Sequence, residues 1–361
     1  MQVFQDTGGL IAIYVGAVVG AGFATGQEIN QFFVGFGRWG LAGVAVAGFL
    51  LVFLGRLILV FTYFHGLADY REGLKVLLGP VGSKVGDAMT SFFLFGGLAI
   101  MLAGGGEVIA HLGVAKALAS LGFAGQVLAG ISGGPQRFTQ VNKLLVPFLI
   151  GMSVLLVAAR WLSWWEVPVV AEGIRPPLFT MGLITPMLLP NWLVAAGLYA
   201  AFNLGIVFTV FSSLGEVILD RRTAEHGAVI SGGLLSLLLV FFYLGILSVP
   251  GAKDQAIPMA YVAAQGPKIA HLAYLFLLMA AMYTSAVANG YALSQRYKAW
   301  FRGSVPLTAA LFLSGAWLLA RGGFVTLVST IYPIYGYLWS VVLIILLLKR
   351  MFAGCIFIGC E

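Results

Sequence analysis

The sequence predicts an all-α protein that crosses a membrane many times, and two observations carry that prediction. Of the 361 residues, 60% are hydrophobic and only 9% are charged, whereas about 25% of a soluble chain is charged. The apolar residues form long unbroken runs and not the roughly ten-residue alternations of a membrane barrel. These features exclude a soluble enzyme, a nucleic-acid-binding protein and a secreted domain. In a membrane protein the net charge of +7 reflects where loops lie and does not indicate an acidic partner.

Ten apolar runs come close to the roughly 20 residues that one membrane span needs. They cover residues 8–33, 38–65, 85–111, 114–132, 142–160, 191–218, 226–248, 269–294, 304–320 and 322–348. If the N-terminus is cytoplasmic, 12 of the 20 Lys and Arg residues fall in cytoplasmic segments and 7 in external ones. The positive-inside rule therefore predicts cytoplasmic N- and C-termini in a cell-membrane protein. The remaining basic residue, Arg56, lies within the second span, and the sequence does not identify its partner.

Three segments outside the spans have their own patterns. The connection 249–268 contains AIPMAYVAAQ, which predicts a short helix lying on the bundle. The stretch 67–79 is amphipathic, so we expect it at the level of the lipid headgroups. The tail 351–361 is too short to span, and the sequence assigns it no role.

The first span is interrupted at its middle by four glycines, Gly16, Gly20, Gly22 and Gly26. One interpretation is a small-residue face that packs against a neighbouring helix. The other is an unwound segment, which a membrane helix tolerates only where its backbone lines a cavity. Carbonyl groups freed in that way can bind a cation. On this second interpretation we expect the backbone from Val19 to Ala24 to be non-helical.

The eighth span carries oxygen-bearing residues on one face. Ala281, Thr284 and Ser285 are spaced i, i+3, i+4, which places them on the same side of a helix. Two hydroxyls and a carbonyl are hard ligands suited to a cation. The alternative is that each hydroxyl bonds a carbonyl of its own helix, which is common in membrane helices.

The sixth span has a similar interruption, with Asn203 and Gly205 inside an apolar run. An interhelical hydrogen bond would also explain the asparagine. However, the first and sixth spans each begin a five-span half, and breaks at corresponding positions of two halves indicate a transporter binding site. We therefore predict a single transmembrane domain over 1–361, with an inverted repeat of about 8–160 and about 191–348 and with helices 1 and 6 discontinuous.

The segment GAVVGAGFATGQEINQFF at 16–33 resembles the amino acid–polyamine–organocation superfamily of transporters, and within it most closely the YkvI-like membrane proteins. The resemblance is strongest over 8–35 and weaker over 191–222 and 269–299. It implies the LeuT-type fold, with ten helices in a five-plus-five inverted repeat.

The resemblance also implies site residues. The family's Gly-x-x-Val-Gly-x-Gly pattern and its Ala-x-x-Thr/Ser-Ser/Thr pattern assign a sodium site to Gly16, Val19, Ala281, Thr284 and Ser285. The substrate would lie beside this ion, against Gly20, Ala21, Gly22, Phe23, Phe202 and Asn203. Asn289 follows Ser285 by one turn on the same face and could reach the same cavity.

Two acidic residues inside spans are further candidates, because ionisable groups in a membrane are costly. Glu28 and Glu107 lie in the half of a span that we predict to be external. Each could serve as a gate, as a vestibule charge or as a partner of a substrate amine. The alternative for each is a structural salt bridge.

The predicted function is a sodium-coupled symporter of a small amino-acid-like or amine solute, working by alternating access. The alternatives are a proton-coupled or uncoupled carrier of the same fold and a membrane receptor that binds a small molecule without moving it. We expect no enzymatic activity, since no catalytic dyad or metal motif is present at matching depth. We also expect no cofactor apart from sodium as the coupling ion. The sequence leaves the solute and any partner subunit undefined.

Overall fold

A computed structural model describes residues 7–67, 69–110, 113–133, 136–162, 185–213, 218, 220–301 and 303–352. Within these residues each of the ten predicted spans coincides with a helix or, for the first span, with a series of short helices. Most of the connection 161–190 lies outside the described residues, and so does the tail beyond residue 352.

The elements follow one another along the chain as the apolar pattern predicts. In order they are α1 (Thr7–Val18), α2 (Ala21–Thr25), α3 (Gln27–Phe32), η1 (Val34–Phe36), α4 (Arg38–His65), α5 (Tyr70–Ala110), α6 (Lys116–Ser132), α7 (Gln136–Trp161), α8 (Thr185–Leu188), α9 (Trp192–Ser212), α10 (Arg221–Leu247), η3 (Ala252–Asp254), α11 (Pro258–Ala264), α12 (Lys268–Tyr297), η4 (Lys298–Phe301), α13 (Val305–Ala320) and α14 (Phe324–Phe352).

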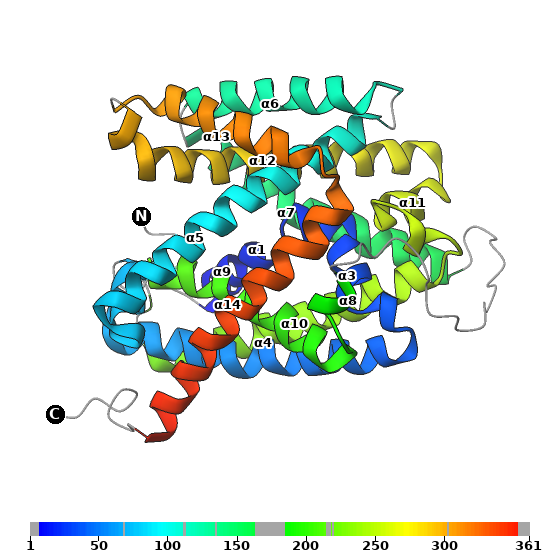
Figure 1. Ribbon diagram of the computed structural model, residues 1–361. Helices are drawn as coiled ribbons and strands as arrows, with labels where there is room; N and C mark the ends of the chain where they lie inside the picture. Colours follow the sequence, from blue (N-terminus) through cyan, green and yellow to red (C-terminus); the bar gives the residue numbers. More distant parts are fainter. Residues whose placement is uncertain are drawn as a thin grey trace.

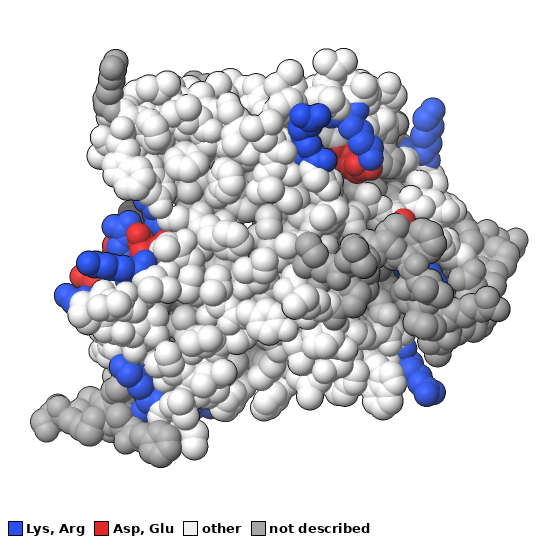
Figure 2. Space-filling view, in the orientation of Figure 1, with Lys and Arg blue, Asp and Glu red and all other residues white. Residues whose placement is uncertain are grey.

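Six of these helices are long and apolar enough to cross a membrane, which makes the chain a multi-pass membrane protein. Charged side chains gather towards the two sides of the molecule in Figure 2, and a broad band between them carries almost none. That distribution is expected when the band faces lipid tails, because exposed charges are costly there.

The spans sort into two groups (Figure 1). In the first group α1, α4, α9 and α10 pack on one another, and in the second α5, α6, α12 and α13 do so. Spans one and two of the first half therefore lie with their counterparts in the second half, and the same holds for spans three and four. This is the arrangement that a five-plus-five repeat predicts. Helix α14 lies between the groups, in contact with α9 and α5.

The first group owes its close packing to small residues. A Cβ atom added at Gly232 of α10 would lie 2.8 Å from the Cα of Val52 in α4, and one at Gly48 of α4 would lie 2.8 Å from the Cβ of Ser236. Small residues at both crossings let the two backbones approach, which is how membrane helices gain contact in the absence of a hydrophobic driving force.

Two of the predicted connecting helices are present. Helix α11 falls within the connection 249–268, as expected. Residues 70–79 of the amphipathic stretch form the first part of α5, which is interrupted at Gly79, where φ is 73° and Pro80 follows. Asp87, which follows the interruption, connects the two parts of α5. Its carboxylate accepts a hydrogen bond from the Tyr70 hydroxyl at 2.5 Å and pairs with Arg71 at 2.8 Å.

Candidate functional site

The first span is broken, and the break begins after Val18. The Gly20 amide, which would close the next α-helical turn on the Gly16 carbonyl, donates to the Val18 carbonyl at 2.9 Å. Gly20 itself is extended, with φ −99° and ψ −171°. The break leaves the Gly16 carbonyl without its usual i+4 amide and places Val19 outside any helix.

The non-helical segment is shorter than predicted. We expected an unwound backbone from Val19 to Ala24, but Ala21–Thr25 forms one short helix, α2. The Thr25 side chain keeps this turn compact, because its hydroxyl donates to the Gly22 carbonyl at 2.6 Å. A second interruption follows at Gly26, whose φ of 75° is left-handed and favours glycine.

A tyrosine from the eighth span is attached to the broken segment. The Tyr274 hydroxyl of α12 donates to the Ala24 carbonyl at 2.5 Å and lies 3.2 Å from the Ser153 hydroxyl of α7. Sequence reasoning missed Tyr274. A buried tyrosine hydroxyl predicts some hydrogen-bond partner, but only the fold shows that this partner is a carbonyl of the broken helix.

Burial differs along the break. Every residue from Ala21 to Ile29 is buried, whereas Gly16 and Gly20 are partly exposed and have no neighbouring atom within 4 Å of an added Cβ. The α1 end of the break is therefore less tightly packed than the α3 end.

The predicted ligands on α12 are placed as follows. Thr284 and Ala281 are buried, and the Thr284 hydroxyl donates to the Ala281 carbonyl at 3.1 Å. Ser285 is half-buried. Helix α12 packs on α2, and the hydrogen bond between them is made by Tyr274, two turns before Ala281. Asn289 has a different neighbour, since its amide nitrogen lies 2.7 Å from where a Cβ of Gly97 in α5 would be.

The prediction of a discontinuous sixth span is wrong for residues 192–212, which form the continuous helix α9. The Asn203 amide group donates to the Tyr199 carbonyl one turn earlier, at 2.9 Å, and so stays within the helix. Gly205 serves packing, because an added Cβ would lie 2.6 Å from three ring atoms of Trp339. Both residues are thus explained without a break.

The predicted substrate-lining aromatics do not share one neighbourhood. Phe23 packs edge-on against Phe242 of α10, with ring centroids 4.9 Å apart. Phe202 stacks on Tyr332 of α14, also at 4.9 Å and with only 13° between the ring planes. Phe32 of α3 lies against Phe202 at 5.7 Å and so links this stack to the first span.

Glu28 lies directly above Gly22, which has no side chain to exclude it. A Cβ at Gly22 would overlap the Glu28 Oε1 atom and would lie 2.9 Å from the Tyr332 hydroxyl oxygen. The Tyr332 hydroxyl and the Glu28 carboxyl group thus lie side by side over Gly22. Glu28 is 5% exposed. Gly22, Glu28 and Tyr332 therefore form one buried unit beside the break, and Phe202 covers it.

Two other charged residues within spans have ionic partners. Glu107 pairs with Lys116 at 2.8 Å, and Arg56 pairs with Glu225 of α10 at 2.9 Å. For Glu107 the salt-bridge alternative thus describes the observed contact. For Arg56 the partner lies far along the chain, and spacing alone could not have identified it.

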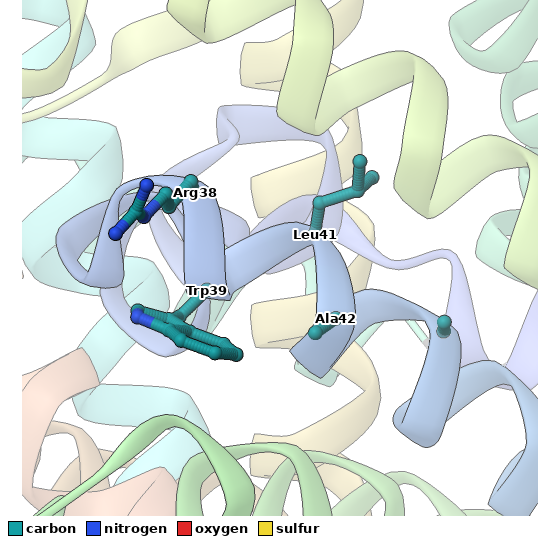
Figure 3. Close-up of a pocket in the computed structure, with 5 residues that line it drawn as sticks. Arg38, Trp39, Leu41 and Ala42 are labelled. Carbon is teal, nitrogen blue, oxygen red and sulfur yellow. The ribbon is translucent and has the colours of Figure 1, made fainter.

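A hollow on the surface at the start of α4 lies apart from these residues (Figure 3). It is lined by Arg38, Trp39, Leu41, Ala42 and Ala45. Trp39 is exposed and stacks on Trp192, with ring centroids 5.7 Å apart. The hollow contains none of the predicted site residues.

The chain is similar to curated relatives over nearly its whole length. It is 29% identical over 329 residues to an uncharacterised membrane protein, YkvI, of Bacillus subtilis (strain 168), and the match covers 91% of each chain. No family model matches the sequence.

Two solved structures resemble the chain in three dimensions. One is MhsT in complex with L-phenylalanine, with a TM-score of 0.62, 16% identity and coverage of 92% of this chain and 87% of MhsT. The other is Mhp1, a nucleobase-cation-symport-1 family transporter, in a closed conformation with bromovinylhydantoin bound. Its TM-score is 0.55, its identity 16%, and the match covers 99% of this chain and 81% of Mhp1. Together with the two groups of spans and the broken first helix, these matches show that the chain is a membrane protein with the LeuT-type fold.

Proposed function

We propose that the chain is a secondary transporter, a sodium-coupled symporter of a small amino-acid-like or amine solute. The observation that supports this most directly is the break in the first span, which is partly exposed at Gly16 and Gly20 and buried from Ala21 to Ile29. Access from one side at a time is what alternating access requires, and LeuT-type transporters bind substrate and ion at such broken helices. The two structural neighbours, one with L-phenylalanine bound and one named as a cation symporter, agree with this proposal.

Sodium would bind between the end of α1 and the middle of α12. On the α1 side the Gly16 and Val19 carbonyls are at the break, and Gly16 has lost its i+4 amide. On the α12 side stand the Ala281 carbonyl and the Thr284 and Ser285 hydroxyls. The Thr284 hydroxyl now donates to Ala281 at 3.1 Å, and its oxygen retains lone pairs for a cation.

The solute would lie next to the ion, against the broken segment at Gly20, Ala21 and Gly22. The open space at Gly20 provides its entrance. We place the N- and C-termini in the cytoplasm, from the distribution of basic residues, so this entrance would face the cell interior. Cysteines introduced at residues 249–268 should then react with an impermeant reagent only from outside the cell.

The test replaces the α12 hydroxyls. Thr284→Ala and Ser285→Ala should each weaken sodium affinity roughly tenfold to a hundredfold, because each removes one proposed oxygen ligand at a cost of about 1–3 kcal/mol. The measurements are the sodium-induced rise in melting temperature of the purified protein and solute flux in proteoliposomes with and without a sodium gradient.

Ser294→Ala provides the matched control on the same helix. The Ser294 hydroxyl is buried and donates to the Gly290 carbonyl at 2.6 Å, as an ordinary helical serine does. Its removal should leave the sodium response unchanged. Unaltered sodium stabilisation in the Thr284→Ala/Ser285→Ala double variant would end the sodium-site proposal. Solute binding without any flux would favour the receptor alternative.

A further inference from the structure

Four buried polar residues meet beside the break, and the sodium site does not use them. Glu28 of α3, Tyr199 and Asn203 of α9 and Tyr332 of α14 together form the Glu28 cluster. All four are at most 5% exposed. The Glu28 carboxyl group and the Tyr332 hydroxyl meet over Gly22, and the Tyr199 and Tyr332 rings both pack against Phe202, at 5.3 and 4.9 Å between centroids. Three spans thus contribute polar groups to one buried point.

Glu28 differs from the other acidic groups at the spans in having a phenol, and not a cation, beside it. Glu107, Glu225 and Asp87 each pair with Lys or Arg within 3.2 Å. Among the described residues the ion pairs do not include Glu28. A buried carboxylate without a counter-ion is strongly destabilising. The position is therefore suited to a group that brings its own positive charge.

Two further atoms of the cluster lack a partner among the described residues. The Tyr199 hydroxyl and the Asn203 Oδ1 atom are buried and make no hydrogen bond. The Asn203 amide nitrogen is already committed to the Tyr199 carbonyl at 2.9 Å, so the atom that Asn203 has left is an acceptor. Glu28 is also an acceptor when ionised. The cluster thus offers acceptors to a ligand that donates several hydrogen bonds.

Aromatic rings surround the same point. Tyr199 and Phe202 lie edge to face with centroids 5.3 Å apart, and Phe202 stacks on Tyr332. Phe32 of α3 packs edge-on against Tyr199 at 5.5 Å. Ring faces attract a desolvated cation, and they exclude neutral polar ligands that cannot replace their water.

We propose that the Glu28 cluster binds the primary ammonium group of the transported solute. An ammonium group has three N–H donors, which match the Glu28 carboxylate, the Asn203 Oδ1 atom and one tyrosine oxygen. Its charge neutralises Glu28, and the absence of a side chain at Gly22 leaves the room that the carboxylate occupies. This inference rests on the proposed transport function but concerns a different set of residues from the sodium site.

The experiment compares three probes of one shape on the purified full-length protein in sodium. Phenethylammonium carries three N–H donors and a charge, phenethyltrimethylammonium carries the charge alone, and 2-phenylethanol carries neither the charge nor the amine. Methylammonium is added as a probe small enough for a narrow space. The primary ammonium probes should raise the melting temperature, because they bind the folded state, and the other two should not.

In Glu28→Gln, which keeps the volume and removes the charge, affinity for both ammonium probes should fall at least tenfold while sodium stabilisation persists. The matched control is Glu225→Gln, which removes an acidic group that has Arg56 as its partner; it should bind the probes normally. If Glu28→Gln does not fold, Tyr199→Phe and Asn203→Leu provide the same test, since each removes an atom that now lacks a partner.

Three results would overturn the inference. The first is equal binding of the ammonium probes by Glu28→Gln and the wild type. The second is a wild-type protein that sodium stabilises but that neither ammonium probe stabilises. The third is equal stabilisation by phenethyltrimethylammonium, which would show that N–H donors are not recognised. The proposed transport function is tested separately, by sodium stabilisation and solute flux of the wild-type protein, so its failure can be distinguished from failure of the Glu28 inference.

Discussion

The first and sixth spans carry the same kind of interruption in sequence and fold differently. Each has glycine in the middle of an apolar run, and each begins one half of the repeat. The first span breaks after Val18 and again at Gly26, whereas the sixth continues as one helix from Trp192 to Ser212. Glycine in a membrane span therefore has two structural uses, and its neighbours decide between them.

In the sixth span the neighbour is a large ring. Trp339 of α14 occupies the space over Gly205, so the glycine brings two helices together and the helix has no reason to unwind. In the first span Gly20 faces open space, and the Tyr274 hydroxyl of α12 donates a hydrogen bond to the Ala24 carbonyl of the broken segment. One glycine allows close packing, and the other lies where the backbone leaves the helix.

The largest effect should come from a pair of glycine substitutions within the break. Gly22→Ala places a methyl group where the Glu28 carboxylate lies, whereas Gly20→Ala adds the same methyl group to open space. We expect Gly22→Ala to weaken phenethylammonium binding on the order of a hundredfold, equivalent to about 3 kcal/mol, and Gly20→Ala to weaken it much less, because Gly20 borders the proposed solute but its new methyl group enters open space. Thermal-shift titration measures both. Similar losses of phenethylammonium affinity in the two variants would mean that binding depends on the break as a whole and not on the position of the Glu28 carboxylate.

A second pair tests the sixth span. Gly205→Ala should destabilise the protein by about 2 kcal/mol, because the new methyl group overpacks against the buried Trp339 ring. Gly197→Ala in the same helix meets no atom within 4 Å and should be neutral or slightly stabilising, since alanine favours a helix over glycine. Chemical denaturation in detergent measures the difference. If Gly205→Ala were harmless, packing against Trp339 would not explain why the sixth span stays unbroken.

The smallest effect concerns the hydroxyl that holds the broken segment. Tyr274→Phe leaves the buried Ala24 carbonyl without its donor and should cost about 1 kcal/mol of stability. Tyr337→Phe is the control, because its hydroxyl also donates to a carbonyl, that of Leu188 at 2.9 Å, but on an exposed side chain. It should cost much less. Equal losses would contradict a special role for the contact at the break.

The positions of the ten spans could be predicted from sequence because the membrane requires a long apolar run for each, and the run is visible without any knowledge of neighbours. The break in the first span could also be predicted, since four glycines in one span lower the cost of leaving the helix. Its length could not, because Ala21–Thr25 regains a helical turn through contacts of Thr25.

The rest of the candidate site depended on partners that are distant along the chain. Tyr199 and Tyr332 have no motif, and they become relevant only when the fold brings α9 and α14 to Glu28. The partner of Arg56 is Glu225, in another half of the repeat. The sodium-site residues match a family pattern in both the first and the eighth span, and their role stays a prediction until the α12 variants are measured.

The contact of Tyr274 with Ala24 has a mechanical consequence. One phenol joins α12, the short helix α2 and, through Ser153, helix α7. This contact restrains the three elements relative to one another. Rotation of the backbone is then easiest at the two hinges on either side of α2. These hinges are the extended backbone at Gly20 and the left-handed turn at Gly26. If sodium binds between α1 and α12 as proposed, it would move the end of α1 towards α12 by rotation at Gly20. The proposed solute entrance at Gly20 would then close while the conformation of α2 stays the same.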